Sequence, residues 1–267
     1  MKFDYQQSLF DEIVEPKEPV RGTYKILFWN IQNPSLERAK KQFSWLFNEN
    51  LDLVVLTEMK ESKAFYYYKG KFEDAGYTLF FETRDGYFTV VAIRNQLAEQ
   101  VNLEMKLMQE RVQAIEFTLN GGKTMLIGAY VPPNSDDINK IERKDYFQKN
   151  LINEIYKYRK NNPLTHIIFG GDFNILEPEH LPKYESFEKW EYFYNYLNKI
   201  KLVDKYRTKE TDDYGHTWVR GRDAQRIDFI FTSSGLENSI EQCTYIHEIR
   251  LNKLSDHSGQ LLVLNRN

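Results

Sequence analysis

Short polar clusters recur along the sequence, most of them directly after a run of apolar residues. They are FWNI with Asn30, VLTEMK with Glu58, GAYVPPN with Tyr130, GGDFN with Asp172 and Asn174, SDH with Asp256 and His257, and QRIDFIF, in which Asp228 stands within an apolar run. Loops that follow strands on a rigid scaffold often carry functional groups. The clusters are therefore candidates for a single site to which several polar side chains contribute.

The donor types in these clusters favour a hard divalent cation. Carboxylate and amide oxygens suit Mg²⁺, or Mn²⁺, together with water and a substrate phosphate. A histidine next to an acid, with a further aspartate elsewhere, suits an imidazole held in one tautomer that stabilises developing negative charge. The sequence contains no CxxC, HExxH or GxxxxGK[ST] pattern, so it offers no recognisable zinc or nucleoside triphosphate site.

Each cluster alone has a simpler structural interpretation. GGDFN could be a turn whose side chains bond the backbone, and SDH could cap a helix. Asp228 is the most informative, because an aspartate between Ile227 and Phe229 is costly to bury without a partner. We predict that the Asp228 carboxylate pairs with the His257 imidazole.

Alternating strands and helices are expected to hold these clusters in place. Short β-branched and aromatic runs predict strands at YKILFW, DLVVLT, TVVAIR, MLIGAYV, HIIFG, RIDFIF and QLLVL. Apolar residues at helical spacing predict helices over residues 36–47, 147–158 and 190–200. The fold class is therefore α/β, or a mixed sandwich of sheets and helices.

The composition predicts a large folded unit. With 267 residues, 41% of them hydrophobic, the chain can bury a substantial core. One cysteine excludes an internal disulfide framework, and the sequence shows neither a signal peptide nor a membrane span, so we expect a cytoplasmic, monomeric protein with no membrane partner. The proline-containing segment before residue 22 predicts a tail and linker over 1–22 and one catalytic domain over 23–267.

The order of the clusters resembles a known family. WN, TE, YVP, GDFN, RIDFIF and SDH follow one another as in the endonuclease/exonuclease/phosphatase superfamily, over about Tyr24 to Leu264. DNase I and the sphingomyelinases carry histidine where this sequence has Tyr130, whereas exonuclease III and its abasic-site endonuclease relatives carry tyrosine. The resemblance implies a DNase I-like four-layer sandwich, in which helices flank two packed mixed β-sheets.

The resemblance also implies a metal centre. Glu58 would be the principal ligand of Mg²⁺ or Mn²⁺, with Asp256 and Asn30 close by, and Asn30 would also belong to the catalytic group.

The remaining residues would act on the water and the phosphate. By the same resemblance, Asp172 would orient or deprotonate the attacking water, and Asn174 would position Asp172 and touch the phosphate. Tyr130 and His257 would contact the phosphate, and Asp228 would hold His257.

The function implied is Mg²⁺-dependent phosphodiester hydrolysis by a DNA endonuclease or exonuclease of exonuclease III type, in DNA repair or processing. One alternative is a phosphatase or phosphodiesterase acting on a small or lipid-linked phosphate. Another is a catalytically silent module that binds DNA or a sliding clamp. The segment HTWVRGRDAQRID is shorter than its counterpart in abasic-site endonucleases, so the resemblance does not extend to their sugar pocket.

Binding of DNA would depend on local charge, because the formal net charge is -3. Arg220, Arg222 and Arg226 cluster just before Asp228, and we predict that they contact backbone phosphates.

The first residues contain a second candidate interaction. QQSLF, with Gln6, Leu9 and Phe10, resembles the short peptide by which bacterial DNA-processing proteins dock on the replicative sliding clamp. The alternative is an amphipathic turn that packs Leu9 and Phe10 on the domain itself.

Overall fold

The computed structural model describes residues 22–210 and 213–266. The peptide with Gln6, Leu9 and Phe10 lies outside the described residues, so docking on a sliding clamp stays a prediction, as does a domain boundary after residue 22. No helix in the described part of the chain is both long enough and apolar enough to cross a bilayer.

Across these two ranges the structure has two large mixed sheets and one small hairpin. The first sheet consists of β1 (Thr23–Asn30), β2 (Leu53–Met59), β3 (Tyr77–Phe81), β4 (Phe88–Arg94), β13 (Ile240–Ile246) and β14 (Gly259–Asn265). Its order is β13-β14-β1-β2-β4-β3, with β1 and β2 parallel and the other neighbours antiparallel.

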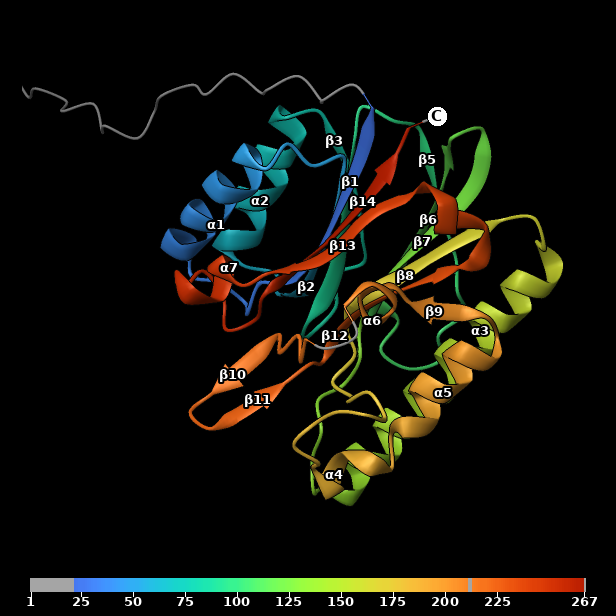
Figure 1. Cartoon of the computed structure of the whole chain (residues 1–267). Helices are drawn as coiled ribbons and strands as arrows, with labels where there is room; N and C mark the ends of the chain where they lie inside the picture. The colour runs from blue at the N-terminus through green and yellow to red at the C-terminus, as the bar shows by residue number, and fades with distance from the viewer. Residues whose placement is uncertain (1–21, 211–212, 267) are drawn as a thin grey trace, which may run out of the picture.

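The second sheet has the same size. It consists of β5 (Ala98–Val101), β6 (Val112–Leu119), β7 (Gly122–Tyr130), β8 (His166–Asp172), β9 (Leu202–Asp204) and β12 (Asp228–Ser233). Its order is β5-β6-β7-β8-β12-β9, with β7 and β8 parallel. The hairpin of β10 (Trp218–Arg220) and β11 (Asp223–Gln225) projects from one end of the sandwich (Figure 1).

Helices cover the outer faces of both sheets. The first sheet carries α1 (Leu36–Asn48), α2 (Lys63–Asp74) and α7 (Glu248–Leu251), whereas α3 (Ile138–Asn161), α5 (Glu191–Lys199) and the short α4 (Glu185–Glu188) lie on the side of the second (Figure 1). A further short helix, α6 (Lys205–Lys209), follows β9. The result is the four-layer sandwich that the resemblance implied.

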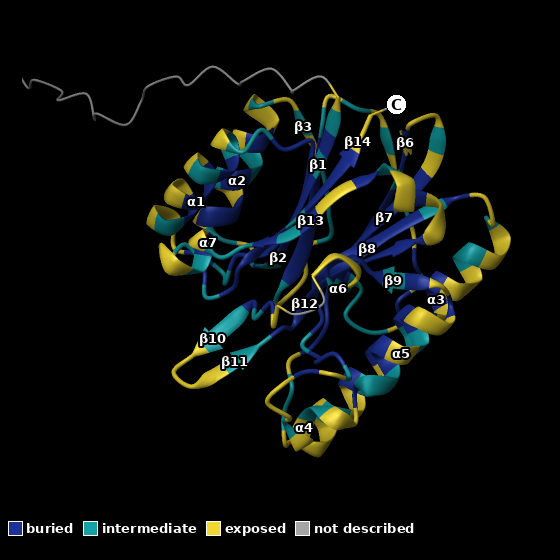
Figure 2. Ribbon diagram, in the orientation of Figure 1, coloured by how far each residue is buried: buried dark blue, intermediate teal, exposed yellow. Residues whose placement is uncertain are grey.

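Alternation along the strands separates the cores. In β1, Ile26 and Phe28 face the second sheet, while Leu27 and Trp29 face the helices α1 and α2. The second sheet likewise directs Phe169 toward α3 and α5, away from the inter-sheet core. Because both faces of each sheet are covered, the central strands are buried along most of their length (Figure 2).

The structure overturns one predicted DNA contact. Arg226 is 0% exposed, so its side chain cannot reach a DNA backbone. Its guanidinium donates to Glu177 at 2.9 and 3.2 Å, to the Tyr245 hydroxyl at 3.1 Å and to Asp204. Arg226 is therefore a structural cation that bridges two buried carboxylates, of which Glu177 is also paired with Arg207.

We predict that Arg226→Met destabilises the fold, because Glu177 and Asp204 would keep buried charge without their shared partner. The loss expected for breaking a buried ion pair is about 3–5 kcal/mol in the free energy of unfolding, measured by urea denaturation. Arg220→Met, at an exposed position, is the matched control and should change it by less than about 0.5 kcal/mol. Equal unfolding free energies for the two variants would contradict this structural role.

Candidate active site

Strand direction brings the polar clusters to one end of the sandwich. The parallel strands β7 and β8 end at Tyr130 and Asp172, which are paired in register. The antiparallel strand β12 begins at Asp228, directly opposite Asp172. The sequence placed Asp228 inside a strand, and the structure shows it as the first residue of that strand. From the other sheet, β1 ends at Asn30 and antiparallel β14 begins just after His257.

A chain of hydrogen bonds links four of these side chains. Asn30 Nδ2 donates to Asp172 Oδ2 at 2.9 Å and lies 3.4 Å from His257 Nε2. On the other side of the ring, His257 Nδ1 donates to Asp228 Oδ2 at 2.9 Å. The predicted pairing of Asp228 with His257 is confirmed. All four residues are buried, so little water competes for these bonds.

The turn after β8 fixes the Asp172 carboxylate. Gly171 has φ +136°, and a Cβ there would lie 2.1 Å from the Ala129 carbonyl oxygen, so only glycine fits this strand end. The backbone amide of Asn174 donates to Asp172 Oδ1 at 2.9 Å, and the side-chain Nδ2 of Asn174 donates to the Val131 carbonyl at 3.0 Å. The backbone amide at position 174 therefore fixes one oxygen of Asp172, while the Asn174 side chain is engaged with the strand end of β7.

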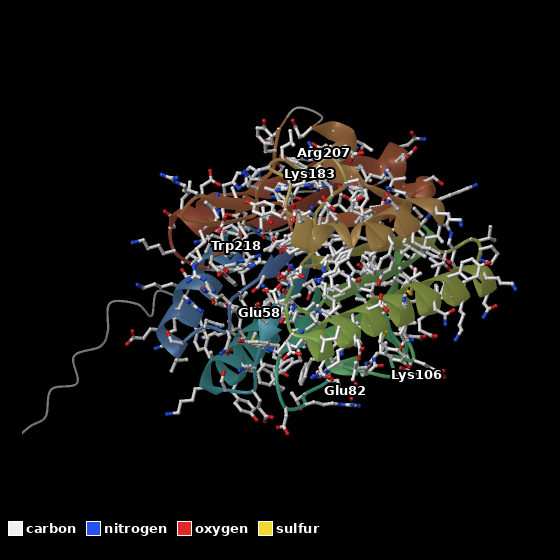
Figure 3. All side chains as sticks on the ribbon, turned by 90° about the horizontal axis from the view of Figure 1, so that it is seen from below. Glu58, Glu82, Lys106, Lys183, Arg207 and Trp218 are labelled. Carbon is white, nitrogen blue, oxygen red and sulfur yellow. The ribbon has the colours of Figure 1, made fainter. Side chains whose placement is uncertain are left out.

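Glu58 leaves the regular path of β2. Its φ is +57°, in the left-handed region, and the pairing of β2 with β4 is irregular between Leu56 and Met59. Such backbone strain is common at functional sites. Glu58 is half-buried, and its charge is among the causes that raise the pKa of Tyr130, so a carboxylate of the first sheet lies near a phenol of the second. Figure 3 views the molecule from this end and labels Glu58.

Burial and mutual charge perturb the ionisable groups. Burial raises the pKa of Asp172 to about 8, and the neighbouring Asp228 adds to this while His257 opposes it. Burial alone would lower the pKa of His257, but the charge and hydrogen bond of Asp228 outweigh burial and raise it to about 10. The site thus places a carboxyl group of raised proton affinity beside an imidazole that tends to be charged.

Tyr130 is kept protonated. Burial, followed by the charges of Glu58 and Asp172, raises the pKa of its hydroxyl, so Tyr130 can act as a hydrogen-bond donor at neutral pH. The Arg111 guanidinium lies over the ring, 4.7 Å from its centroid, and Tyr87 packs edge-on at 5.8 Å.

Two sets of side chains could hold a metal ion. One is Asp172, Asp228 and His257, whose ligand atoms lie within 4.8 Å of one another. The atoms that this set would offer are already joined by hydrogen bonds. The other includes Asp256, whose Oδ2 accepts from Trp218 Nε1 at 3.3 Å, while no donor among the described residues reaches its buried Oδ1.

An unsatisfied buried carboxylate oxygen is costly unless a cation or water completes it. Asp256 and Glu58 each offer the hard carboxylate oxygens that a divalent cation prefers, so the chemistry of each side chain fits such an ion.

Several residues of the site were not recognisable from the sequence. Arg111 contacts Tyr130, Lys144 Nζ donates to the Asn174 carbonyl at 2.6 Å, and Trp218 holds Asp256. Thr217 Oγ1 accepts from the backbone amide of Asp228 at 3.3 Å. Trp218 and Thr217 stand in the segment before Asp228, but nothing in the local sequence distinguishes Arg111 or Lys144 from surface cations.

The two remaining predicted DNA contacts lie at the edge of the site. Arg220 and Arg222 are exposed on the β10–β11 hairpin, and Trp218 at its base forms an isolated bridge with His257. Their contact with DNA stays a prediction.

We predict that Asp228 and His257 act as one unit in the reaction. Asp228→Asn and His257→Ala should each lower kcat by about 10² to 10³, and the double variant should lose little more than His257→Ala alone. Single-turnover rates of the four proteins complete the cycle. His166→Ala, at the opposite end of β8, is the control partner and should combine additively with Asp228→Asn. Additive losses for Asp228 and His257 would rule out the unit.

Comparison with known proteins agrees with this geometry. The family model described as Endonuclease-reverse transcriptase matches residues 124–260, just over half of the chain, which include Tyr130, Asp172, Asp228 and His257. No curated protein matches the sequence significantly.

Solved structures share the fold at low sequence identity. An AP endonuclease from Archaeoglobus fulgidus superposes with TM-score 0.75 at 19% identity, over 90% of this chain and 99% of that one. A 3' phosphatase from Neisseria bound to a product DNA hairpin superposes with TM-score 0.74 at 20% identity, over 90% of this chain and 98% of that one. A 3'-5' exonuclease from Neisseria meningitidis superposes with TM-score 0.73 at 21% identity, over 89% of this chain and 98% of that one.

Superfamily members of this kind are hydrolytic nucleases or phosphodiesterases, and they usually depend on a divalent metal. The family match, the two-sheet fold and the clustered acids and imidazole lead to one conclusion: the chain belongs to the endonuclease/exonuclease/phosphatase superfamily and is a hydrolase of the nuclease/phosphodiesterase class.

Proposed function

We propose that this protein is a Mg²⁺- or Mn²⁺-dependent DNA nuclease of exonuclease III type that works in DNA repair or processing. The observation that carries the proposal is the buried chain of side chains from Asp172 through Asn30 and His257 to Asp228, assembled from both sheets. An acid, an amide and an imidazole in this arrangement suit attack of water on a phosphodiester.

Asp172 orients the attacking water and accepts its proton. Its two oxygens are held by Asn30 and by the backbone amide of Asn174, so the carboxylate is fixed before substrate binds. A carboxylate whose pKa is raised toward neutral pH is a stronger base than an exposed one, which favours proton abstraction.

His257 and Tyr130 neutralise charge on the phosphate. Asp228 holds the His257 ring by its Nδ1 proton, which leaves Nε2 directed toward Asn30 and Asp172. The protonated Tyr130 hydroxyl donates from the other side of the site. Donors fixed in advance in a dry site stabilise transition-state charge more strongly than donors in water.

Glu58 and Asp256 would hold the metal ion, with Asn30 nearby. When bound, such an ion neutralises the phosphate and the leaving 3'-oxygen. Trp218 keeps one Asp256 oxygen in place and leaves the other directed at no protein donor among the described residues.

A cationic pocket supports a polyanionic substrate. It has a volume of about 290 Å³ and is lined by Met108, Arg111, Pro132, Pro133, Asn134, Ser135, Lys140 and Arg143, with no acidic side chain among them. Arg111 connects this pocket to Tyr130, so a substrate phosphate next to the reacting one would meet positive charge. The solved structures above include a 3' phosphatase bound to DNA, which favours DNA as the substrate.

The same metal centre could serve a smaller phosphate ester, which remains the alternative substrate class. Turnover of plasmid, nicked, abasic-site and single-stranded DNA, beside RNA and inositol phosphates, separates the two. Cleavage of inositol phosphates without cleavage of any nucleic acid would favour the alternative. A silent binding module does not agree with membership in a hydrolase family.

We predict that Asp172→Asn lowers DNA cleavage by at least about 10², because an amide cannot accept the proton of the attacking water. The variant should stay folded, since the amide oxygen can still accept from Asn174. Cleavage rates and circular dichroism of the two proteins test this. A folded Asp172→Asn protein with nearly parental turnover would remove Asp172 from the role of base.

We predict that Glu58→Gln raises the Mg²⁺ concentration needed for half-maximal cleavage, because a neutral amide binds a hard cation more weakly. A Mg²⁺ titration of kcat measures the shift, and Glu61→Gln, an exposed acid three residues on, is the control. Full activity of the parent protein in excess chelator would refute metal dependence altogether.

A further inference from the structure

The segment that leads into β10 carries a feature that the proposed chemistry does not use. Its residue Thr217 is part of the site: Thr217 Oγ1 accepts from the amides of Ile227 and Asp228, and its carbonyl accepts from the Ser258 amide at 2.8 Å. The segment before Thr217 therefore runs directly into the site.

Four aromatic rings form a row that starts in this segment. Tyr214 and His216 are stacked, with centroids 5.4 Å apart and planes 15° apart. His216 meets His180 at 5.4 Å, and His180 meets Tyr184 at 6.1 Å. We refer to Tyr214, His216, His180 and Tyr184 as the aromatic row.

The outer ring of the row is exposed but its backbone is held. Tyr214 is 57% exposed. The neighbouring Gly215 has φ +61°, and a Cβ there would lie 2.5 Å from the Tyr206 ring, so only glycine permits this turn. Asp213 Oδ1 accepts from the Gly215 amide at 3.1 Å, and Arg207 Nη1 donates to the Asp213 carbonyl at 2.6 Å.

His180, the third ring of the aromatic row, is uncharged. Burial, followed by the nearby His216, lowers the pKa of His180 to about 4, so its imidazole is neutral at physiological pH. A neutral ring supports stacking without attracting counter-ions.

We propose that Tyr214, backed by His216, is a stacking platform for an unpaired nucleobase of the strand that the enzyme cleaves. This inference rests on the proposed nuclease function. Every base has a π-face, so an aromatic platform binds single-stranded nucleic acid without selecting a sequence. Because the backbone of Tyr214 is already fixed, little conformational entropy is lost when a base stacks on it.

The platform makes a specific demand on the substrate. A base within a duplex already stacks on its neighbours, so it gains little from Tyr214, whereas an unpaired base of the bound strand gains an aromatic partner. The structure therefore assigns to this enzyme a preference for unpaired or frayed DNA at its site.

Fluorescence of 2-aminopurine reports stacking directly. Single-stranded oligonucleotides that carry the probe at successive positions are bound, with Mg²⁺ present, to Asp172→Asn protein, in which cleavage is slowed and the proposed metal ligands Glu58 and Asp256 are unaltered. Quenching is expected at one or two positions. Tyr214→Ala in the same background should abolish this quenching, and Tyr214→Phe should retain it. Tyr156→Ala, at a tyrosine 47% exposed on α3, is the matched control and should also retain it.

Kinetics of the otherwise unaltered enzyme provide the second measurement. Tyr214→Ala should raise KM for single-stranded DNA about fivefold or more, the weaker end of one base stack, and leave kcat within about twofold. For a fully paired duplex of the same sequence, KM should change by less than about twofold. Tyr214→Phe should restore the parental KM.

The two measurements separate this inference from the proposed function. If the parent protein cleaves DNA and Tyr214→Ala has the same KM for single-stranded DNA, the platform is overturned and the nuclease function is not. Quenching that persists in the Tyr214→Ala variant has the same meaning. Quenching that depends on Tyr214 in a protein that cleaves no nucleic acid supports the platform and overturns the nuclease. No quenching by the Asp172→Asn protein at any position overturns the platform.

Discussion

Two buried carboxylates that face each other across a strand pair constrain the rest of this structure. The register of β8 with β12 sets Asp172 opposite Asp228, and neither side chain has more than slight contact with water. Like charges in such a place repel, so the pair is tolerable only with a cation or a shared proton between them. His257 meets this need from the other sheet, with Nδ1 on Asp228 and Nε2 3.9 Å from Asp172. The electrostatic need of the two carboxylates is thus met by a side chain that the packing of the two sheets brings to them.

The backbone at this end of the sandwich departs from regular geometry where the chemistry requires it. Glu58 and Asn174 adopt left-handed conformations although neither is glycine, and Gly171 occupies a position closed to other residues. These departures stand at or next to the ends of β2 and β8, beside Tyr130 and Asp172. Strain of about 1–3 kcal/mol per residue persists only where the surroundings over-determine it. Here the extensive cores on both faces of each sheet supply that constraint.

The sequence alone could predict those strands and contacts that depend on the residues next to one another in the chain. The runs around Phe28, Val55 and Ile168 form strands as predicted, because periodicity and β-branching decide them. The pairing of Asp228 with His257 was predictable because a lone buried acid needs a partner. Arg226 was misassigned because its partner Glu177 is 49 residues away, so charge counting could not show its burial. Helix α2 was missed because its aromatic residues also suit strands, and it is tertiary packing that makes this segment helical.

The segment before β12 carries both residues that position the reacting groups and exposed residues that we propose contact the substrate. Through Thr217 it holds the backbone at Asp228, through Trp218 it holds Asp256, and the carbonyl of Thr217 fixes the residue after His257. One stretch therefore positions the acid behind the imidazole and a candidate metal ligand, while its exposed neighbours Tyr214 and Arg220 face the solvent. Substrate choice can then change by substitution at the exposed positions, because the inward-facing ones alone maintain the geometry of the reacting groups.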